Sequence, residues 1–80
     1  MDVPEIDYRG KEPPSKQVAA WLRQQIAAGE YAGGRPLPSE KDLMGLFGLS
    51  RDSIRRVFRL LRDEGLIVTV PQRGSYVRED

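Results

Sequence analysis

Arginine is the residue type with the clearest chemistry in this chain, and it recurs along one short segment. Four arginines follow one another at steps of four, four and three residues: Arg51, Arg55, Arg59 and Arg62. On a helix, such steps place side chains along one ridge. Each guanidinium presents a planar fork of N–H donors that fits a pair of acceptor atoms on an anion or a base. This spacing therefore predicts a helix with a binding surface for an anionic partner.

The charge distribution along the chain favours the same prediction. The 80 residues carry a net charge of only +1, but residues 35–62 alone carry +4, with seven basic side chains and three acidic ones. Residues 1–14 and residues 63–80 each carry −2. A basic block between acidic ends is typical of a segment that meets an anion. Charge alone leaves a second interpretation open, in which the arginines form a solvated helix face.

The composition argues against several other classes of protein. The chain contains no His and no Cys, so an ordinary catalytic triad, a thiolate metal site and a histidine metal site are all excluded. Gly33-Gly34-Arg35 lacks the spacing and the Lys-Ser/Thr ending of a phosphate-binding loop. No run of about 18 apolar residues and no signal-peptide pattern occurs. We therefore expect a cytoplasmic protein that is not an enzyme, needs no cofactor or metal and has no membrane contact.

Two helix starts lie close together in the middle of the chain. Ser39 and Ser50, eleven residues apart, can each cap the first turn of a helix. Asp42 stands at the capping-box position after Ser39, and Gly48 suits the left-handed residue that follows a helix end. Two short helices joined by a tight turn that contains glycine indicate a helix-turn-helix.

Each predicted helix has an apolar face that supports this assignment. The first, over residues 15–28, carries Val18, Trp21, Leu22 and Ile26 and ends at Gly29. The second, over residues 40–47, is expected to bury Leu43, Leu46 and Phe47. The third, over residues 51–64, is expected to bury Ile54, Val57, Phe58 and Leu61. Three helices with matching apolar faces predict one small helical core.

A β-hairpin is predicted after the third helix. Residues 66–70 are rich in β-branched side chains, residues 71–74 form a turn, and residues 75–78 return as the second strand. The expected fold is mainly α with a small β-hairpin, a winged helix-turn-helix over residues 15–80. Residues 1–14 are polar and proline-rich and predict a flexible N-terminal arm, which Ile6 and Tyr8 can attach to the domain.

Four linked motifs carry a family resemblance. They are LPSEKDL at residues 37–43, GLSRDSIR at 48–55, LRDEGLI at 61–67 and RGSYV at 73–77. In sequence and spacing they closely resemble the DNA-binding domain of the GntR family of bacterial transcription regulators, over about residues 15–78. The family pattern consists of an LPSE helix start, a G-V-S-R-x-T-V-R recognition helix, an E-G-L-I exit and a G-x-G-T-[FY]-V wing.

The resemblance implies sequence-specific binding to double-stranded DNA by a transcription regulator that acts as a repressor. The recognition helix, about residues 51–64, would enter the major groove, and the wing, residues 71–75, would lie at the minor groove. A palindromic operator and a homodimer on DNA are further family expectations, and an effector would bind only a further domain outside this chain. A winged helix that binds another protein without reading DNA is the alternative, and an apolar or acidic third helix would have favoured it.

Ten residues are predicted to contact DNA: Ser39, Lys41, Ser50, Arg51, Asp52, Ser53, Arg55, Arg56, Arg73 and Gly74. Asp52 departs from the family, which usually has a neutral residue there. It can accept from a cytosine amino group or hold Arg56 in place. The wing segment 71–74 lacks the first glycine of the family's turn, so the hairpin is expected to be stiffer or differently aimed. Ser15 replaces a frequent Tyr at the start of the first helix.

Overall fold

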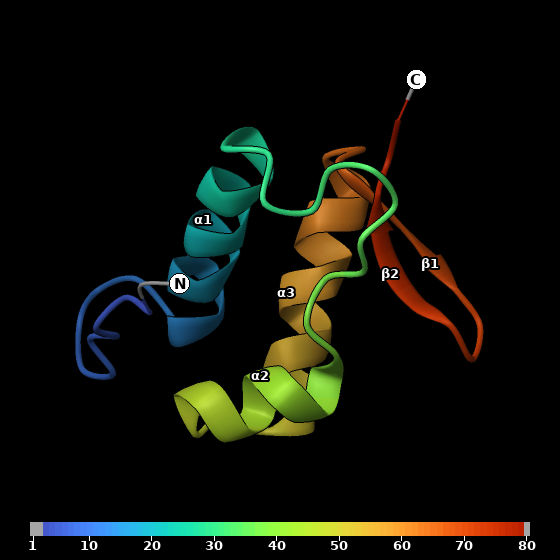
Figure 1. Ribbon diagram of the computed structural model, residues 1–80. Coiled ribbons are helices and arrows are strands. Elements are labelled where there is room, and N and C mark those ends of the chain that lie inside the picture. Colours follow the sequence, from blue (N-terminus) through green and yellow to red (C-terminus); the bar gives the residue numbers. More distant parts are fainter. Residues whose placement is uncertain (1–2, 80) are drawn as a thin grey trace.

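The chain folds into three helices followed by an antiparallel hairpin (Figure 1). The computed structural model describes residues 3–79. Helix α1 spans Pro14–Ala27, α2 spans Glu40–Phe47 and α3 spans Arg51–Asp63; strands β1 and β2 span Ile67–Val70 and Gly74–Val77. This element order confirms the predicted winged helix-turn-helix, in which the hairpin is the wing.

Local capping determines where α2 and α3 begin. The Ser39 Oγ accepts a hydrogen bond from the backbone N–H of Asp42 at 3.0 Å, and the Asp42 carboxylate accepts the Ser39 N–H at 3.2 Å. Ser50 caps α3 in the same way, since its Oγ accepts from the Ser53 N–H at 3.2 Å. Gly48 ends α2 with a φ of 64°, a left-handed conformation that favours glycine. The predicted capping box and the predicted turn glycine are both confirmed.

Several predicted boundaries are wrong by one residue. Helix α1 begins at Pro14, because a proline fits the first helical position, where its missing N–H costs nothing. It ends at Ala27, and α3 ends at Asp63. Strand β1 starts one residue later than predicted, because the Leu66 N–H is still bonded to the Leu61 carbonyl at the helix exit, at 3.0 Å. Strand β2 starts and ends one residue earlier.

The core lies between the three helices and continues to the base of the hairpin. Val18 and Leu22 of α1, Leu43 of α2 and Ile54 and Leu61 of α3 are fully buried. The predicted burial of Leu46 is wrong: its side chain is 47% exposed. The eight-residue helix α2 turns its Leu43 and Phe47 side inward, and Met44 packs against the core instead. Trp21 packs edge-on against Phe47, with ring centroids 5.5 Å apart.

Both strands join the hairpin to the rest of the domain, β1 through its contacts with α3 and β2 through the segment before α2. The register pairs Ile67 with Val77 and Thr69 with Ser75. The Leu37 N–H donates to the Ser75 carbonyl at 2.8 Å, and Pro36 forms a β-bridge with Tyr76. The hairpin therefore projects from one side of α3, while its β2 strand contacts the segment that leads into α2.

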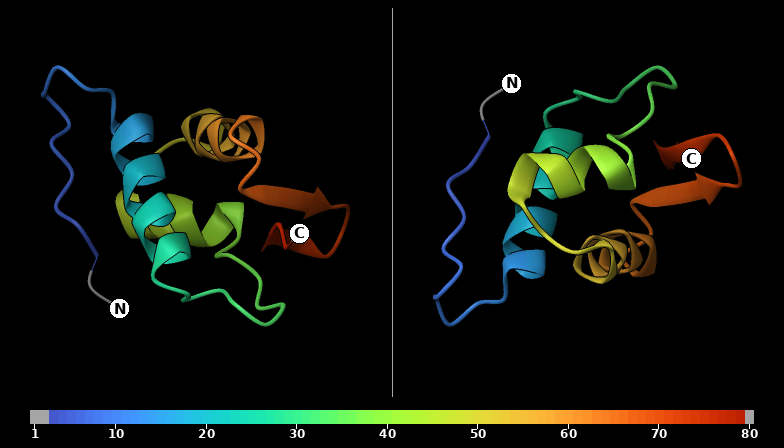
Figure 2. Two further views of the ribbon diagram at one scale, coloured as in Figure 1. Left: turned by 90° about the horizontal axis from the view of Figure 1, so that it is seen from above. Right: turned by 90° about the horizontal axis from the view of Figure 1, so that it is seen from below.

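The N-terminal segment lies on the other side of the molecule, against the helices (Figure 2). Ile6 is buried, and the Tyr8 hydroxyl donates to the Phe47 carbonyl. The Gln17 side chain bonds the backbone of Asp7 in both directions, at 2.8 and 2.9 Å. The predicted attachment through Ile6 and Tyr8 is confirmed. Residues 1–2 and 80, which belong to the predicted arm and domain, lie outside the described residues.

Candidate nucleic-acid interface

The outward side of α3 is strongly basic. Arg51, Arg55, Arg56 and Arg59 are all exposed, because the opposite side of the helix supplies Ile54, Val57, Phe58 and Leu61 to the core. Within residues 3–79, no hydrogen bond or ion pair engages the guanidinium groups of Arg51, Arg56 and Arg59. These three side chains are therefore available to an anion without first breaking an internal contact.

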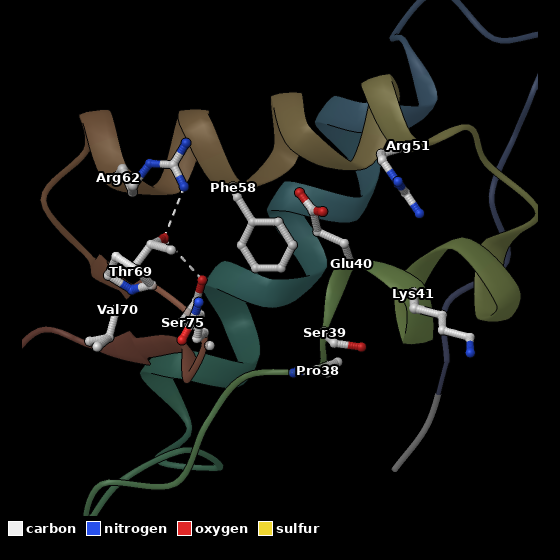
Figure 3. A pocket seen from close by; sticks show the side chains of 13 residues that line it. Pro38, Ser39, Glu40, Lys41, Arg51, Phe58, Arg62, Thr69, Val70 and Ser75 are labelled. Atoms are coloured by element: carbon white, nitrogen blue, oxygen red, sulfur yellow. Dashed lines mark hydrogen bonds between the residues drawn. The ribbon is translucent and has the colours of Figure 1, made fainter.

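A groove of about 420 Å³ separates α3 from the wing (Figure 3). Its lining comes from the start of α2, from α3 and from the hairpin, and four predicted site residues are among it: Ser39, Lys41, Arg51 and Gly74. Lys41 and Arg51 lie at one end and Arg62 at the other, with the buried ring of Phe58 between them. The groove is thus lined by three cationic side chains, with an aromatic ring between them.

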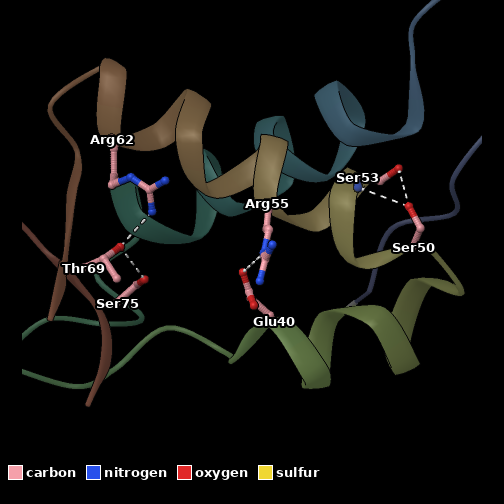
Figure 4. Close-up of polar contacts among 7 residues, drawn as sticks. All are labelled: Glu40, Ser50, Ser53, Arg55, Arg62, Thr69 and Ser75. Carbon is pink, nitrogen blue, oxygen red and sulfur yellow. Dashed lines mark hydrogen bonds and ion pairs between the residues drawn. The ribbon is translucent and has the colours of Figure 1, made fainter. Parts of the chain in front are cut away.

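Arg55 is held by a residue that the sequence did not single out for this role. Its Nε lies 3.3 Å from the Glu40 Oε2, in an ion pair between α3 and the first residue of α2 (Figure 4). Both side chains are more than 40% exposed, so this pair adds little to stability. Its effect is on orientation, since an arginine bound through Nε still has both terminal nitrogens free. The LPSE motif places Glu40 at a helix start, but a separation of fifteen residues along the chain gives no signal for an ion pair with Arg55.

Arg62 departs from the predicted ridge. Its Nη1 donates to the Thr69 Oγ1 at 2.9 Å, so the guanidinium is turned toward the wing (Figure 4). The acidic neighbours that could have paired with the later arginines, Asp52 and Asp63, do not do so in the described part of the chain. In particular, no contact joins Asp52 to Arg56, so the structure does not support the interpretation that Asp52 holds Arg56.

The other six predicted residues do not line this groove. Ser50 and Ser53 stand together at the start of α3, with their hydroxyls 3.1 Å apart. Arg56 faces the α1 side, where it lines a second hollow with Lys16 and Arg59. Arg73 is exposed at the tip of the wing. The ten predicted residues therefore lie around the start of α2, the exposed side of α3 and the wing, and not in one pocket.

The wing turn has an unusual backbone. Gln72 has a φ of 65°, and it is the only non-glycine residue with a positive φ in the described chain. The Arg73 N–H bonds the Val70 carbonyl at 3.0 Å, and Pro71 precedes Gln72, which is the pattern of a type II turn. Such a turn requires a positive φ at the position of Gln72. Gln72 therefore occupies a left-handed turn position that favours glycine, the residue that the family pattern has there.

The model of the family described as "Bacterial regulatory proteins, gntR family" matches residues 14–77. The chain belongs to the GntR family. Among curated GntR relatives, it is 37% identical over 71 residues to the mannosyl-D-glycerate transport/metabolism system repressor MngR of Escherichia coli. That match covers 89% of this chain and 30% of MngR, so the chain spans less than a third of that relative's length.

Solved GntR structures have the same fold. YtrA of Sulfolobus acidocaldarius, a GntR-family transcription factor, superimposes with a TM-score of 0.82 and 34% identity, over 95% of this chain and 80% of that one. The DNA-binding domain of AraR in complex with operator ORR3 superimposes with a TM-score of 0.81 and 28% identity, over 98% and 93% of the two chains. By their names, MngR is a repressor, YtrA is a transcription factor and the AraR domain binds an operator. No helix within residues 3–79 is long and apolar enough to cross a membrane.

Proposed function

We propose that this GntR domain binds double-stranded DNA sequence-specifically and serves as the DNA-binding part of a bacterial transcription repressor. The observation that carries the proposal is the exposed basic side of α3, with unpaired guanidinium groups beside a cation-lined groove. A packed helix with free donors on its outward side can insert into a major groove, which admits one α-helix. The DNA-binding domain of AraR has the same fold and was solved in complex with an operator, which supports DNA binding by this domain.

In the proposed complex, α3 lies in the major groove and the wing reaches the adjacent minor groove. The hairpin projects from one side of α3, so both can face the same duplex (Figure 1). Arg73 at the wing tip supplies a cation for the minor groove, whose negative potential attracts arginine. Gly74 at the tip leaves room for a close approach to the DNA backbone.

Arg51 and Arg55 are proposed to read bases. Each can donate two hydrogen bonds to guanine O6 and N7, and each good pair contributes about 1–3 kcal/mol of discrimination. For Arg55, the ion pair with Glu40 leaves the two terminal nitrogens for this contact. Asp52 is proposed to accept from a cytosine amino group. Since it has no partner in residues 3–79, its carboxylate is free to do so.

The other predicted residues are proposed to bind phosphate. Lys41 offers an exposed ammonium at the start of α2. Ser39, Ser50 and Ser53 lie at helix N-termini, where backbone N–H groups and the helix dipole favour an anion. Arg56 lies further round α3 and is proposed to contact the phosphates of the DNA strand on the α1 side. Phosphate contacts position the domain without reading sequence.

Two features of the whole regulator also belong to this proposal. The repressor would act in the bacterial cytoplasm, bound to the nucleoid, and would bind a palindromic operator as a homodimer. An effector would bind another domain of the regulator. The domain described here matches under a third of the length of MngR.

Fluorescence anisotropy tests the proposal after a binding site has been selected from random duplexes. Arg51→Ala and Arg55→Ala should each weaken binding to the selected site by about 5- to 150-fold and relax its sequence preference. Lys41→Ala should weaken all duplexes alike and lower the slope of log K against log salt by about 1.

Arg35→Ala is the charge-matched control. Arg35 is exposed and unpaired in the connection between α1 and α2, which passes the hairpin on the side away from α3 (Figure 2). Its loss should leave the affinity close to that of the parent. Binding that does not weaken between low and moderate salt would contradict the proposal, because phosphate neutralisation makes affinity depend on salt. That outcome would favour a winged helix that binds protein.

A further inference from the structure

A chain of side-chain hydrogen bonds connects the recognition helix to both strands of the wing. Arg62, in the last turn of α3, donates from Nη1 to the Thr69 Oγ1 at 2.9 Å (Figure 4). The Thr69 Oγ1 lies 3.1 Å from the Ser75 Oγ. Thr69 and Ser75 are directly opposite one another in the hairpin. One guanidinium therefore contacts β1 directly and β2 through a single hydroxyl.

The position of this contact along the hairpin is important. At the base, Ile67 is buried and the Arg78 N–H bonds the Leu66 carbonyl at 2.9 Å. Beyond the base, Val68 and Val70 of β1 are exposed and add little packing. A two-stranded hairpin is at best marginally stable by itself. Strand β2 is held beside the segment before α2, because the Leu37 N–H donates to the Ser75 carbonyl at 2.8 Å and Pro36 forms a bridge with Tyr76. The hydrogen bond from Arg62 to Thr69 instead joins β1 to α3, so it ties the outer half of the wing to the recognition helix itself.

The wing tip lies just beyond the Thr69–Ser75 pair. Only the Val70–Gly74 pair lies between the Thr69–Ser75 pair and the turn that contains Arg73. Because a strand extends by about 3.3 Å per residue, a tilt of the hairpin about its base displaces the tip more than any other part. A hydrogen bond at Thr69 restricts this tilt close to Arg73, the residue whose placement matters.

We infer that Arg62 is a positioning residue for DNA recognition, which sets the direction of the wing through Thr69 so that Arg73 meets its groove while α3 occupies the neighbouring one. The inference rests on the proposed function. It gives Arg62 a different role from that of Arg51 and Arg55, which present free donors to DNA. The guanidinium group with which Arg62 donates to Thr69 is charged, and hydrogen bonds from charged donors are stronger than those between neutral groups.

Thr69→Val is the sharpest test, because it removes the acceptor hydroxyl, preserves the shape and leaves every cation in place. Affinity for a selected duplex should fall by about three- to tenfold, as expected for the loss of one hydrogen bond from a charged donor near the surface. Thr69→Ser keeps the hydroxyl and should bind like the parent. Urea unfolding of both variants verifies that the domain remains folded.

The same substitution in an Arg73→Ala background separates positioning from general damage. If Arg62 acts through the wing tip, Thr69→Val should cause almost no further loss of affinity once Arg73 is absent, because the direction of the wing then no longer places an arginine in its groove. The two substitutions should therefore be strongly non-additive. The salt slope of Thr69→Val should also fall toward that of Arg73→Ala. If Thr69→Val does not fold, Arg62→Met in both backgrounds provides the same comparison.

Three results would overturn the inference: parent-like binding by Thr69→Val, an equal loss with and without Arg73, or parent-like binding by Arg73→Ala. A parent domain that binds no duplex at all would instead contradict the proposed function, so the two failures are distinguishable.

Discussion

The strained wing turn makes a prediction about stability that is independent of DNA. Gln72 has a φ of 65°, and the left-handed region costs a residue with a Cβ about 1–2 kcal/mol. Gln72→Gly removes this cost but gives the unfolded chain more freedom, which offsets about 0.4–1 kcal/mol. The net expectation is a stabilisation of about 0.5–1 kcal/mol. For a domain of this size, that corresponds to a rise in Tm of about 2–8 °C.

Urea and thermal unfolding measure this change, with two control variants. Gln72→Ala removes the side chain but keeps the strained backbone, so it should give no comparable gain. Gly48→Ala makes the opposite change at nearly the same φ, 64°, where an added Cβ would meet nothing within 4 Å. It should therefore destabilise the domain by about 0.5–1 kcal/mol through the backbone alone.

Amide hydrogen exchange tells whether the gain is local to the wing. The Arg73 N–H bonds the Val70 carbonyl across the turn, so Gln72→Gly should slow its exchange. If Gln72→Gly were no more stable than the parent, and Arg73 exchanged at the parent rate while Gly48→Ala lost stability, the reasoning from backbone strain at Gln72 would be refuted.

Two further predictions concern the core and the α1–α3 contact. The Tyr31 hydroxyl is buried without a hydrogen-bond partner among the described residues, and burial raises its pKa, so Tyr31→Phe should stabilise the domain by about 1 kcal/mol in urea unfolding. The parent should also lose stability relative to Tyr31→Phe as the pH rises above about 10, where the unfolded state releases the tyrosine proton first; equal pH profiles would contradict this. Arg23 donates two hydrogen bonds of 2.7 Å to Glu64, and these lower the pKa of the Glu64 carboxyl. The stabilising effect of the Arg23–Glu64 ion pair should be present above pH 4.5 and be lost as the pH falls through the lowered pKa of Glu64. The difference in free energy of unfolding between the parent and Glu64→Gln should therefore shrink in acid. A difference that stays constant from pH 7 to about pH 2 would show that the ion pair does not contribute.

Local interactions made much of the fold readable from the sequence alone. The Ser39–Asp42 capping box, the Ser50 cap and the left-handed Gly48 each involve residues at most four positions apart, so their types and spacing are sufficient to predict them. The buried face of α3 follows from the period of the helix. The same motifs carried the resemblance to the GntR family, because the family pattern consists largely of these local signals.

The tertiary structure decided which polar groups meet. Glu40 and Arg55 are fifteen residues apart, and the relative placement of α2 and α3 brings them together. Arg62 turned to Thr69 because the hairpin folds back beside α3, which no helical spacing could indicate. Leu46 remained exposed because Leu43, Met44 and Phe47 share the side of α2 that faces the core, and the turn of the helix directs Leu46 away from that side.

The sequence by itself thus determined the elements, their ends and the arginine-rich helix, since these depend on neighbours along the chain. Which arginines are free and which are held depends on how the helices and the wing pack against one another, and only the folded chain decided that.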